Sequence, residues 1–193
     1  MVRNLALPSF AGQVLAIIGD MAYRNKTYVA FASENIHTYR LMQAWRQNQH
    51  IDFDFFDAHD INTARDSSLD ETIRRRLRER LANTKQALVL LSDDAFRKSK
   101  ISASFLHYEL IVIASLNVPV VFVNLNQMRT IDYARIPAQL GAPYYTVSVS
   151  YQPLIIKYAL DGYADAFVTN KTASQPRTGP HYYEASTYAS LGL

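Results

Sequence analysis

The chain has 193 residues, of which 49% are hydrophobic and 19% are charged, and its formal net charge is +3. These values are typical of a single globular domain with a substantial core, and they exclude an intrinsically disordered chain. The chain contains no cysteine, which excludes disulfides, a thiol nucleophile and cysteine-based zinc sites, and fits the reducing cytoplasm. No stretch approaches the roughly 18 apolar residues of a membrane span, so we expect neither membrane insertion nor a signal peptide.

The first half of the chain alternates predicted strands with predicted helices. Residues 26–33 (KTYVAFAS) form a β-rich run, and residues 36–49 follow with the apolar spacing of a helix. Residues 51–57 (IDFDFFD) alternate apolar and acidic side chains, which is typical of a strand near a sheet edge. The sequence SLDE at 68–71 is a capping box and predicts a helix over 69–82.

The second half continues this alternation. Unbroken apolar runs at 86–92 and 118–126 predict strands that are covered on both faces, with a helix at 102–117 between them. We predict that residues 93–100 (DDAFRKSK) form a loop. Three further elements are predicted: a short helix or turn at 136–143, a strand at 143–150 and a helix at 151–167.

This order of elements predicts an α/β domain with a five-stranded parallel sheet, flavodoxin-like in its strand order 2-1-3-4-5, and with helices on both faces. We divide the chain into an N-terminal extension at 1–25, the α/β domain at 26–167 and a C-terminal tail at 168–193. The tail has no hydrophobic periodicity, so the sequence predicts no secondary structure for it.

Polar residues gather where such a sheet binds its ligands, beyond the carboxyl ends of the strands. The segments 33–35, 57–60 and 92–94 each follow a predicted strand. The chain has no glycine-rich dinucleotide loop, no P-loop and no nucleophile elbow. It also has no H-x-x-x-H pair, and a solvated loop explains 57–60 better than a metal site does. We therefore expect no bound metal and no resident cofactor.

The stretch IRRRLRER (73–80) carries five arginines. Acidic residues stand four positions from several of them, as in the pair Arg75 and Glu79, and this spacing is typical of a solvent-exposed helix face with ion pairs. No aromatic residue is interleaved with the arginines, so we expect no nucleic-acid binding. Docking of a protein partner is the functional alternative.

A single carboxylate, Glu109, stands in the apolar sequence SFLHYELIVIAS (104–115). Phe105, Val112 and Ile113 lie three or four positions away, which puts Glu109 on or beside the apolar stripe of the predicted helix. Burial disfavours a charged carboxylate and raises its pKa. The pattern alone leaves two interpretations open, a residue at the solvent rim and a residue kept for chemistry.

Three longer segments carry a resemblance to a known family: 26–45 (KTYVAFASENIHTYRLMQAW), 53–92 with its DAHDINTARD sequence and arginine-rich helix, and 105–126 (FLHYELIVIASLNVPVVFVNLN). Together they resemble the TIR-like family that was first defined as a domain of unknown function and that includes the TIR-like component of Thoeris antiphage systems. The resemblance covers about residues 26–140 and implies a TIR fold. It also implies cleavage of the nicotinamide–ribose bond of NAD, with a non-catalytic interaction module as the alternative.

The resemblance implies roles for individual residues. Glu109 would be the catalytic carboxylate, and it follows an aromatic residue, which is tryptophan in the family and Tyr108 here. The expected substrate-binding residues are Phe31 and Tyr108 beside the nicotinamide, Ser33 and Asn35 at ribose or phosphate, Asp57 and Arg65 from the loop after the second strand with Arg65 at the diphosphate, and Ser99 (or Ser102) as a pocket serine. One carboxylate suffices for this reaction because nicotinamide is a good leaving group and needs no acid to protonate it.

The expected partners also follow from the resemblance. NAD would be a substrate rather than a cofactor. We expect assembly into a homo-oligomer on activation, a phage-derived trigger, and a nucleotide product that is sensed by a downstream effector in the cytoplasm.

Overall fold

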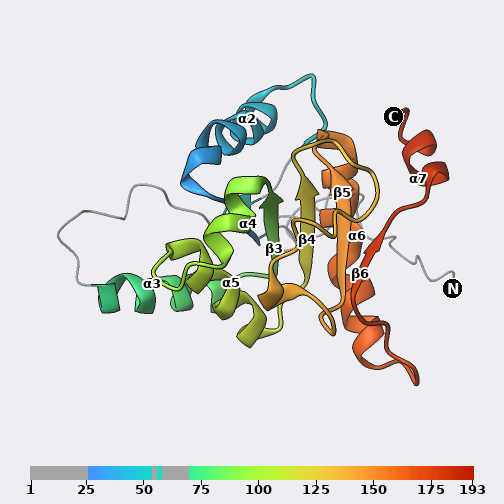
Figure 1. The fold of residues 1–193 in the computed structure, drawn as a ribbon. Helices are drawn as coiled ribbons and strands as arrows, with labels where there is room; N and C mark the ends of the chain where they lie inside the picture. Colours follow the sequence, from blue (N-terminus) through green and yellow to red (C-terminus); the bar gives the residue numbers. More distant parts are fainter. Residues whose placement is uncertain (1–25, 54–55, 58–69) are drawn as a thin grey trace, which may run out of the picture.

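The computed structural model describes residues 26–53, 56–57 and 70–193. Within them, the strands form one parallel sheet of six strands in the order β2-β1-β3-β4-β5-β6 (Figure 1). The strands are β1 (Lys26–Ala30), β2 (Phe56–Asp57), β3 (Gln86–Leu91), β4 (Val120–Asn124), β5 (Thr146–Ser150) and β6 (Pro180–Tyr182). The helices are α2 (Ile36–Gln47), α3 (Asp70–Ala82), α4 (Asp93–Ser99), α5 (Phe105–Leu116), α6 (Pro153–Lys171) and α7 (Ala185–Ser190), with short 3-10 helices η1 (Ser33–Asn35) and η3 (Ala138–Leu140). The predicted flavodoxin-like α/β fold is confirmed.

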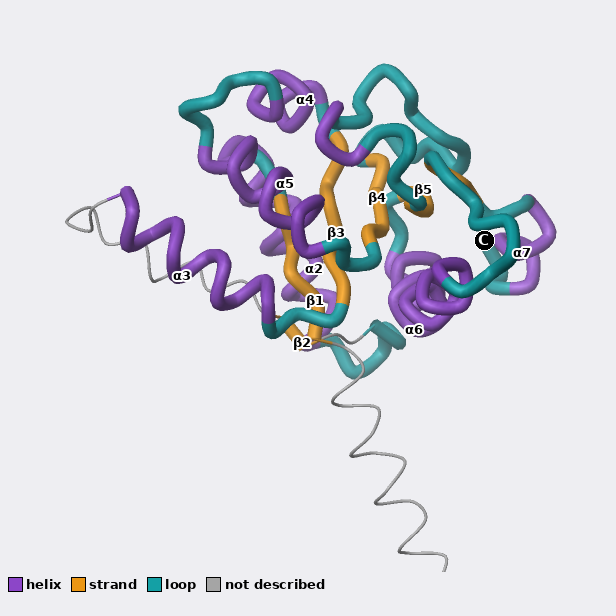
Figure 2. Tube along the Cα trace, turned by 90° about the horizontal axis from the view of Figure 1, so that it is seen from below, coloured by secondary structure: helices purple, strands orange, loops and turns teal. Residues whose placement is uncertain are grey.

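Each face of the sheet has its own apolar layer, because successive strand residues point to opposite faces. In β1, Val29 packs in the layer with α2 and α6, whereas Tyr28 and Ala30 belong to the layer with α3 and α5. Figure 2 shows α5 and α6 on opposite sides of the strands. Strands β3 and β4 are buried along their whole length, which explains their unbroken apolar sequences.

The strand predicted at 51–57 is much shorter in the structure. Only Phe56–Asp57 pairs with β1, and residues 54–55 lie outside the described part of the chain. Residues 51–53 turn instead, because the Phe53 amide donates a hydrogen bond to the Ile51 carbonyl at 2.8 Å. The buried Phe53 ring then packs edge-on against Trp45 of α2, with the ring centroids 5.7 Å apart. The alternation of apolar and acidic residues over 51–57 therefore predicted a longer strand than the structure contains.

The loop predicted after the third strand is wrong, because this segment forms helix α4. Ser92 caps the helix, since its hydroxyl accepts a hydrogen bond from the Ala95 amide at 3.0 Å. Two aspartates occupy the first turn, and Arg97 and Lys98 occupy the last, so the side-chain charges complement the helix dipole at both ends. Capping and charge, rather than apolar periodicity, stabilise this short helix.

The tail, for which the sequence predicts no structure, extends the sheet in the structure. Helix α6 continues to Lys171, and β6 pairs in parallel with β5. Gly179 enters β6 with a φ of +73°, a conformation that favours glycine, and its carbonyl accepts a hydrogen bond from Thr146 at 3.2 Å. Tyr188 of α7 is fully buried, and its hydroxyl accepts a hydrogen bond from the Ser150 amide at 3.1 Å.

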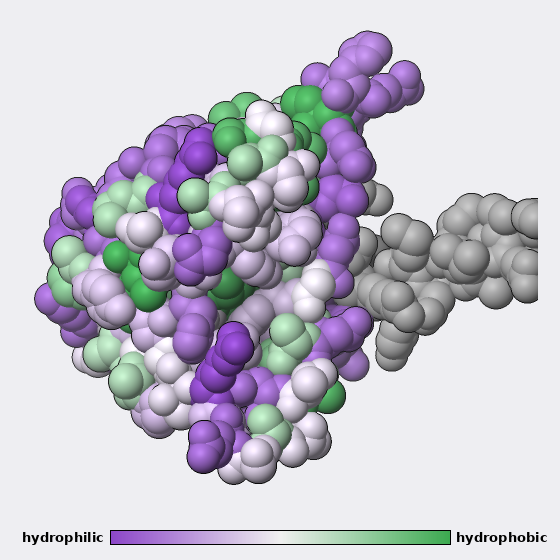
Figure 3. Space-filling model, turned by 90° about the vertical axis from the view of Figure 1, so that its right-hand side faces the viewer, coloured by the Kyte–Doolittle hydropathy of each residue, from purple (hydrophilic) through white to green (hydrophobic). Residues whose placement is uncertain are grey.

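The surface on the side of β6 and α7 is mostly hydrophilic, with small separate hydrophobic areas (Figure 3). Among the helices in the described part of the chain, none combines the length and the apolar character that crossing a bilayer requires. Tyr182 of β6 is 43% exposed, whereas the residues of β5 beside it are buried. The tail therefore covers β5, which would otherwise be an edge strand of the sheet.

Candidate functional site

The connections from β1 and β3 leave the sheet in opposite directions. The chain runs from β1 to β2 on one side and returns to β3 on the other, so β1 and β3 flank the switch point where such sheets bind ligands. The segments that follow these two strands meet there, because the Ser92 hydroxyl donates a hydrogen bond to the Asn35 side-chain oxygen at 2.6 Å. Asn35 is buried, and Ser92 also caps α4. One hydrogen bond thus fixes η1 against the start of α4.

Charged groups gather beside this contact. The Lys98 ammonium lies 3.1 Å from the Glu34 carboxylate and 3.4 Å from the Ser33 hydroxyl, and the Arg97 guanidinium lies 3.7 Å from the same Glu34 oxygen. The Ser33 hydroxyl donates a hydrogen bond to the other Glu34 oxygen at 3.0 Å. Hydrogen bonds from the Glu34 backbone, Lys98 and Ser33 lower the pKa of Glu34, so its carboxylate is ionised at neutral pH. We call Ser33, Glu34, Arg97 and Lys98 the switch-point cluster.

An aromatic pair lies at the beginning of α2. Phe31 stacks on Tyr39 with the ring centroids 4.8 Å apart. The Tyr39 hydroxyl donates a hydrogen bond to Asp57, and the Gln43 amide donates to the Tyr39 hydroxyl at 3.1 Å. Asp57 is thereby bound to α2, and these contacts fix the end of β2.

Glu109 lies on the buried face of α5, and only 2% of its surface is exposed. The hydroxyl of Tyr28, in the middle of β1, donates a hydrogen bond to the Glu109 carboxyl group. Burial raises the pKa of Glu109 to about 8, and the hydrogen bond from Tyr28 opposes this rise. The carboxyl group is therefore mostly protonated at pH 7. Of the two interpretations that the sequence left open, the solvent rim is wrong.

The partner of Glu109 and the switch-point cluster belong to different parts of the β1 segment. Tyr28 pairs in register with Ala87, which precedes Ser92 by five residues. At about 3.3 Å per residue, the backbone of Tyr28 and that of Ser92 are separated by on the order of 16 Å along the strands. The structure thus places Ser33 and Asn35 together in η1, whereas the hydrogen-bond donor to Glu109 is Tyr28, five residues before Ser33.

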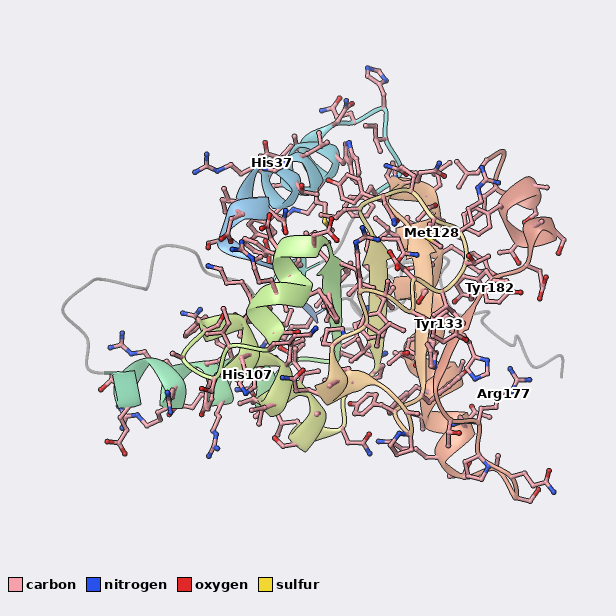
Figure 4. All side chains as sticks on the ribbon, in the orientation of Figure 1. His37, His107, Met128, Tyr133, Arg177 and Tyr182 are labelled. Carbon is pink, nitrogen blue, oxygen red and sulfur yellow. The ribbon has the colours of Figure 1, made fainter. Side chains whose placement is uncertain are left out.

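The other predicted site residues have contacts of their own. The Tyr108 ring faces α3, with the Arg74 guanidinium 4.9 Å and the Arg78 guanidinium 6.0 Å from its centroid. Ser99 is buried at the end of α4, where its carbonyl accepts a hydrogen bond from the Gln139 amide at 2.8 Å and lies 2.6 Å from Nδ1 of His107. His107 belongs to α5 (Figure 4), so this contact joins α4, α5 and η3.

Two of the predictions from the sequence concern residues that the structure does not describe. Arg65 and the segment 58–66, which we expected to line a nucleotide pocket, lie outside the described residues.

Sequence reasoning missed Tyr28, Lys98 and the hydrogen bond of Ser92. Tyr28 lies 81 positions from Glu109, and no local pattern links the two residues. Lys98 was missed because its segment was predicted to be a loop rather than a helix. Ser92 was noticed as a polar residue after a strand, and its place before two aspartates is the capping signal that would have revealed α4.

The comparisons with known proteins bear on the segment that contains these groups. A family model described as the TIR-like domain of the Thoeris protein ThsB matches residues 28–129. No curated protein matches the chain. The matched segment runs from Tyr28 of β1 to beyond the end of β4, and it includes the switch-point cluster and Glu109. Because this match covers just over half of the 193 residues, the chain belongs to the family of TIR-like domains of the Thoeris defence protein ThsB.

Proposed function

We propose that this protein is a cytoplasmic TIR-like enzyme that cleaves the nicotinamide–ribose bond of NAD and produces a nucleotide signal in bacterial antiphage defence. One observation carries the proposal: the family-matched segment holds a carboxyl group, that of Glu109, whose pKa burial raises to about 8. Ionisable groups with strongly perturbed pKa values occur preferentially at functional sites, because catalysis needs them near neutrality.

The reaction requires little acid–base chemistry from the protein. The bond between the ribose C1′ and the nicotinamide nitrogen breaks, and its electron pair leaves with the nitrogen, which becomes neutral. Positive charge develops on the ribose, and a carboxylate beside it stabilises this charge. Water, or a nucleophilic group of the ADP-ribose itself in a cyclisation, then bonds to C1′ and releases a proton. Glu109 is the carboxylate that we assign to this role.

A cationic substrate would lower the raised pKa of Glu109. The bound nicotinamide ring of NAD carries a positive charge, and a neighbouring positive charge lowers the pKa of a carboxyl group. The substrate thus favours the ionised form that the reaction needs. Because Glu109 is 2% exposed, α3 or α5 must move away from β1 to admit the ribose. We assign this movement to assembly into a homo-oligomer in response to a phage-derived trigger.

A second function is favoured by the same burial. The hydrogen bond from Tyr28 and the surrounding apolar layer also suit a Glu109 that only helps to pack α5 against β1. In that case, the protein is a non-catalytic interaction module of the defence system, as the fold alone permits.

Incubation of the full chain with NAD, followed by chromatography, separates the two functions. The experiment is done with and without lysate from phage-infected cells, because activation is expected to need a trigger. We expect the wild-type protein to release nicotinamide and Glu109→Gln to lower this turnover at least ~100-fold. Glu184→Gln is the matched control, since Glu184 is exposed in the tail and its substitution should leave turnover unchanged.

Circular dichroism must show that both variants are folded. Intact NAD under every condition would favour the interaction module. Nicotinamide release that persists in Glu109→Gln would remove Glu109 from the mechanism but not the cleavage of NAD from the function.

A further inference from the structure

The ion-paired surface that the sequence predicts for the arginine-rich helix forms only in part. Helix α3 has five arginines and three acidic residues. The Arg75 guanidinium lies 4.0 Å from its expected partner, the Glu79 carboxylate. Arg74 and Arg78 have no ion pair with any side chain in the described part of the chain. Because these two residues are four positions apart, two positive charges without a countercharge lie on the same side of α3.

Both unpaired arginines lie over one aromatic ring of α5. The Arg74 guanidinium is 4.9 Å and the Arg78 guanidinium is 6.0 Å from the centroid of the Tyr108 ring. A guanidinium group stacks through its flat face, so the N–H donors at its edge stay available to an acceptor. Like charges four positions apart on a helix repel each other. An anion bound between the two groups would accept these hydrogen bonds and remove the repulsion.

Exposed apolar side chains flank the same ring. Phe105 and Ile111 lie three positions before and after Tyr108, a spacing that makes them its neighbours on the surface of α5. Their exposed fractions are 49% and 43%. Figure 2 shows α3 and α5 as neighbours, with α3 at the edge of the molecule. We call Arg74, Arg78, Phe105, Tyr108 and Ile111 the arginine–aromatic surface.

The composition of this surface is typical of a protein–protein interface. Arginine and aromatic residues are enriched at the centre of such interfaces and supply many of the side chains that dominate binding. A small anion would contact the guanidinium groups alone and leave the apolar side chains in water. Single-stranded nucleic acid stacks its bases on open aromatic rings, whereas the Tyr108 ring already stacks with the two arginines. A protein segment that carries both carboxylates and apolar side chains fits the whole surface.

We propose that the arginine–aromatic surface binds an acidic, amphipathic segment of a partner protein. Carboxylates of this segment accept hydrogen bonds from Arg74 and Arg78. Its apolar side chains cover Phe105 and Ile111 and remove them from water. This docking function goes beyond the cleavage of NAD, and it does not depend on Glu109, which lies on the buried face of α5.

Fluorescence anisotropy of the full chain with a labelled peptide tests the surface. The probe is a synthetic amphipathic helix of about 14 residues, which makes four turns, with glutamate on one face and leucine beside it. A second probe has glutamine in place of every glutamate. The acidic probe should bind, and its dissociation constant should rise with salt, because salt screens the attraction between exposed charges. The glutamine probe should bind at least ~10-fold more weakly.

The variants locate the binding on α3. A chain with both Arg74→Gln and Arg78→Gln should raise the dissociation constant of the acidic probe at least ~30-fold, since two charge-assisted hydrogen bonds are lost. Arg75→Gln is the matched control, because it removes the same charge from the same helix at a residue that is paired with Glu79. It should change the dissociation constant by about twofold or less. Circular dichroism must show that the variants are folded.

Three results would overturn the proposal: no binding of the acidic probe, equal binding of the glutamine probe, or equal weakening by Arg75→Gln and the double variant. The comparison of the two probes needs no variant, so it decides even where a substitution disturbs α3. Tighter binding of a short RNA that depends on the same arginines would assign the surface to nucleic acid. Dimers of the wild-type chain that the double variant abolishes would assign it to a second copy, and either assignment contradicts the proposal.

Discussion

Replacing Glu109 by glutamine should make the fold more stable at neutral pH. In the unfolded chain, the Glu109 carboxyl group titrates near its ordinary pKa of 4.5, whereas burial raises the pKa in the folded protein to about 8. Below pH 4.5 the group is protonated in both states and has no effect. Between these two values the unfolded chain loses the proton and the folded protein keeps it, so the free energy of unfolding falls as the pH rises.

The size of this effect follows from the same two pKa values. Between pH 4.5 and pH 7 there are about 2.5 pH units, and each lowers the free energy of unfolding by about 1.36 kcal/mol. The free energy of unfolding of the wild-type protein is therefore about 3 kcal/mol lower at pH 7 than below pH 4.5. The loss levels off near pH 8, at about 5 kcal/mol. Glutamine has the shape of the protonated acid and stays neutral at every pH. The Tyr28 hydroxyl can still donate to its amide oxygen, so Glu109→Gln should avoid most of this loss.

Urea denaturation at several pH values from 5 to 9 measures the difference directly. The gap in unfolding free energy between Glu109→Gln and the wild type should widen from pH 5 to pH 8 and then stay constant, whereas Glu184→Gln should follow the wild type throughout. Parallel curves for Glu109→Gln and the wild type would mean that the buried carboxyl group is ionised, which contradicts the reasoning. A glutamine variant that is less stable at pH 7 would instead favour a purely structural role for Glu109.

Two further predictions concern the hydrogen bond of Tyr28 and the packing of the tail. Tyr28→Phe removes the hydrogen bond that lowers the pKa of Glu109, so the rise of kcat/KM for NAD with pH should move to higher pH; an unmoved profile would exclude the carboxylate form of Glu109 as the active one. Tyr188→Ala empties a fully buried site in the tail and should cost about 3–5 kcal/mol in urea denaturation. Tyr182→Ala, at a residue that is 43% exposed, should cost about 0.5 kcal/mol or less, and equal losses would show that α7 does not pack as described.

The fold was predictable where local pattern and burial agree. Strands β3 and β4 are buried on both faces, and their continuous apolar sequences identified them. Helix α4 escaped prediction because its stability comes from the cap at Ser92 and from charges at its ends rather than from an apolar stripe. Strand β6 has only three residues and depends on pairing with β5, a contact that no local pattern encodes.

The candidate site was predictable only in part, for a related reason. The apolar neighbours of Glu109 on α5 indicated that it lies on or beside the buried stripe, and the structure buries it. Its hydrogen-bond donor, Tyr28, lies on another element 81 positions away, and Ser92 and Asn35 meet across 57 positions. Polar residues after a strand indicate a site in such a fold. Which of these residues come together depends on how the strands pair, and no local sequence pattern encodes this pairing.

Two carboxyl groups of this site have pKa values shifted in opposite directions. Glu34 is exposed beside Lys98 and has a lowered pKa, so it stays charged across the neutral range. Glu109 is buried beside Tyr28 and has a pKa of about 8, so it titrates within that range. Environments that push the pKa values of two carboxyl groups apart give them different tasks. A change from pH 6 to pH 8.5 therefore acts on Glu109 and leaves Glu34 ionised, which means that cleavage of NAD by the proposed mechanism should rise over this interval.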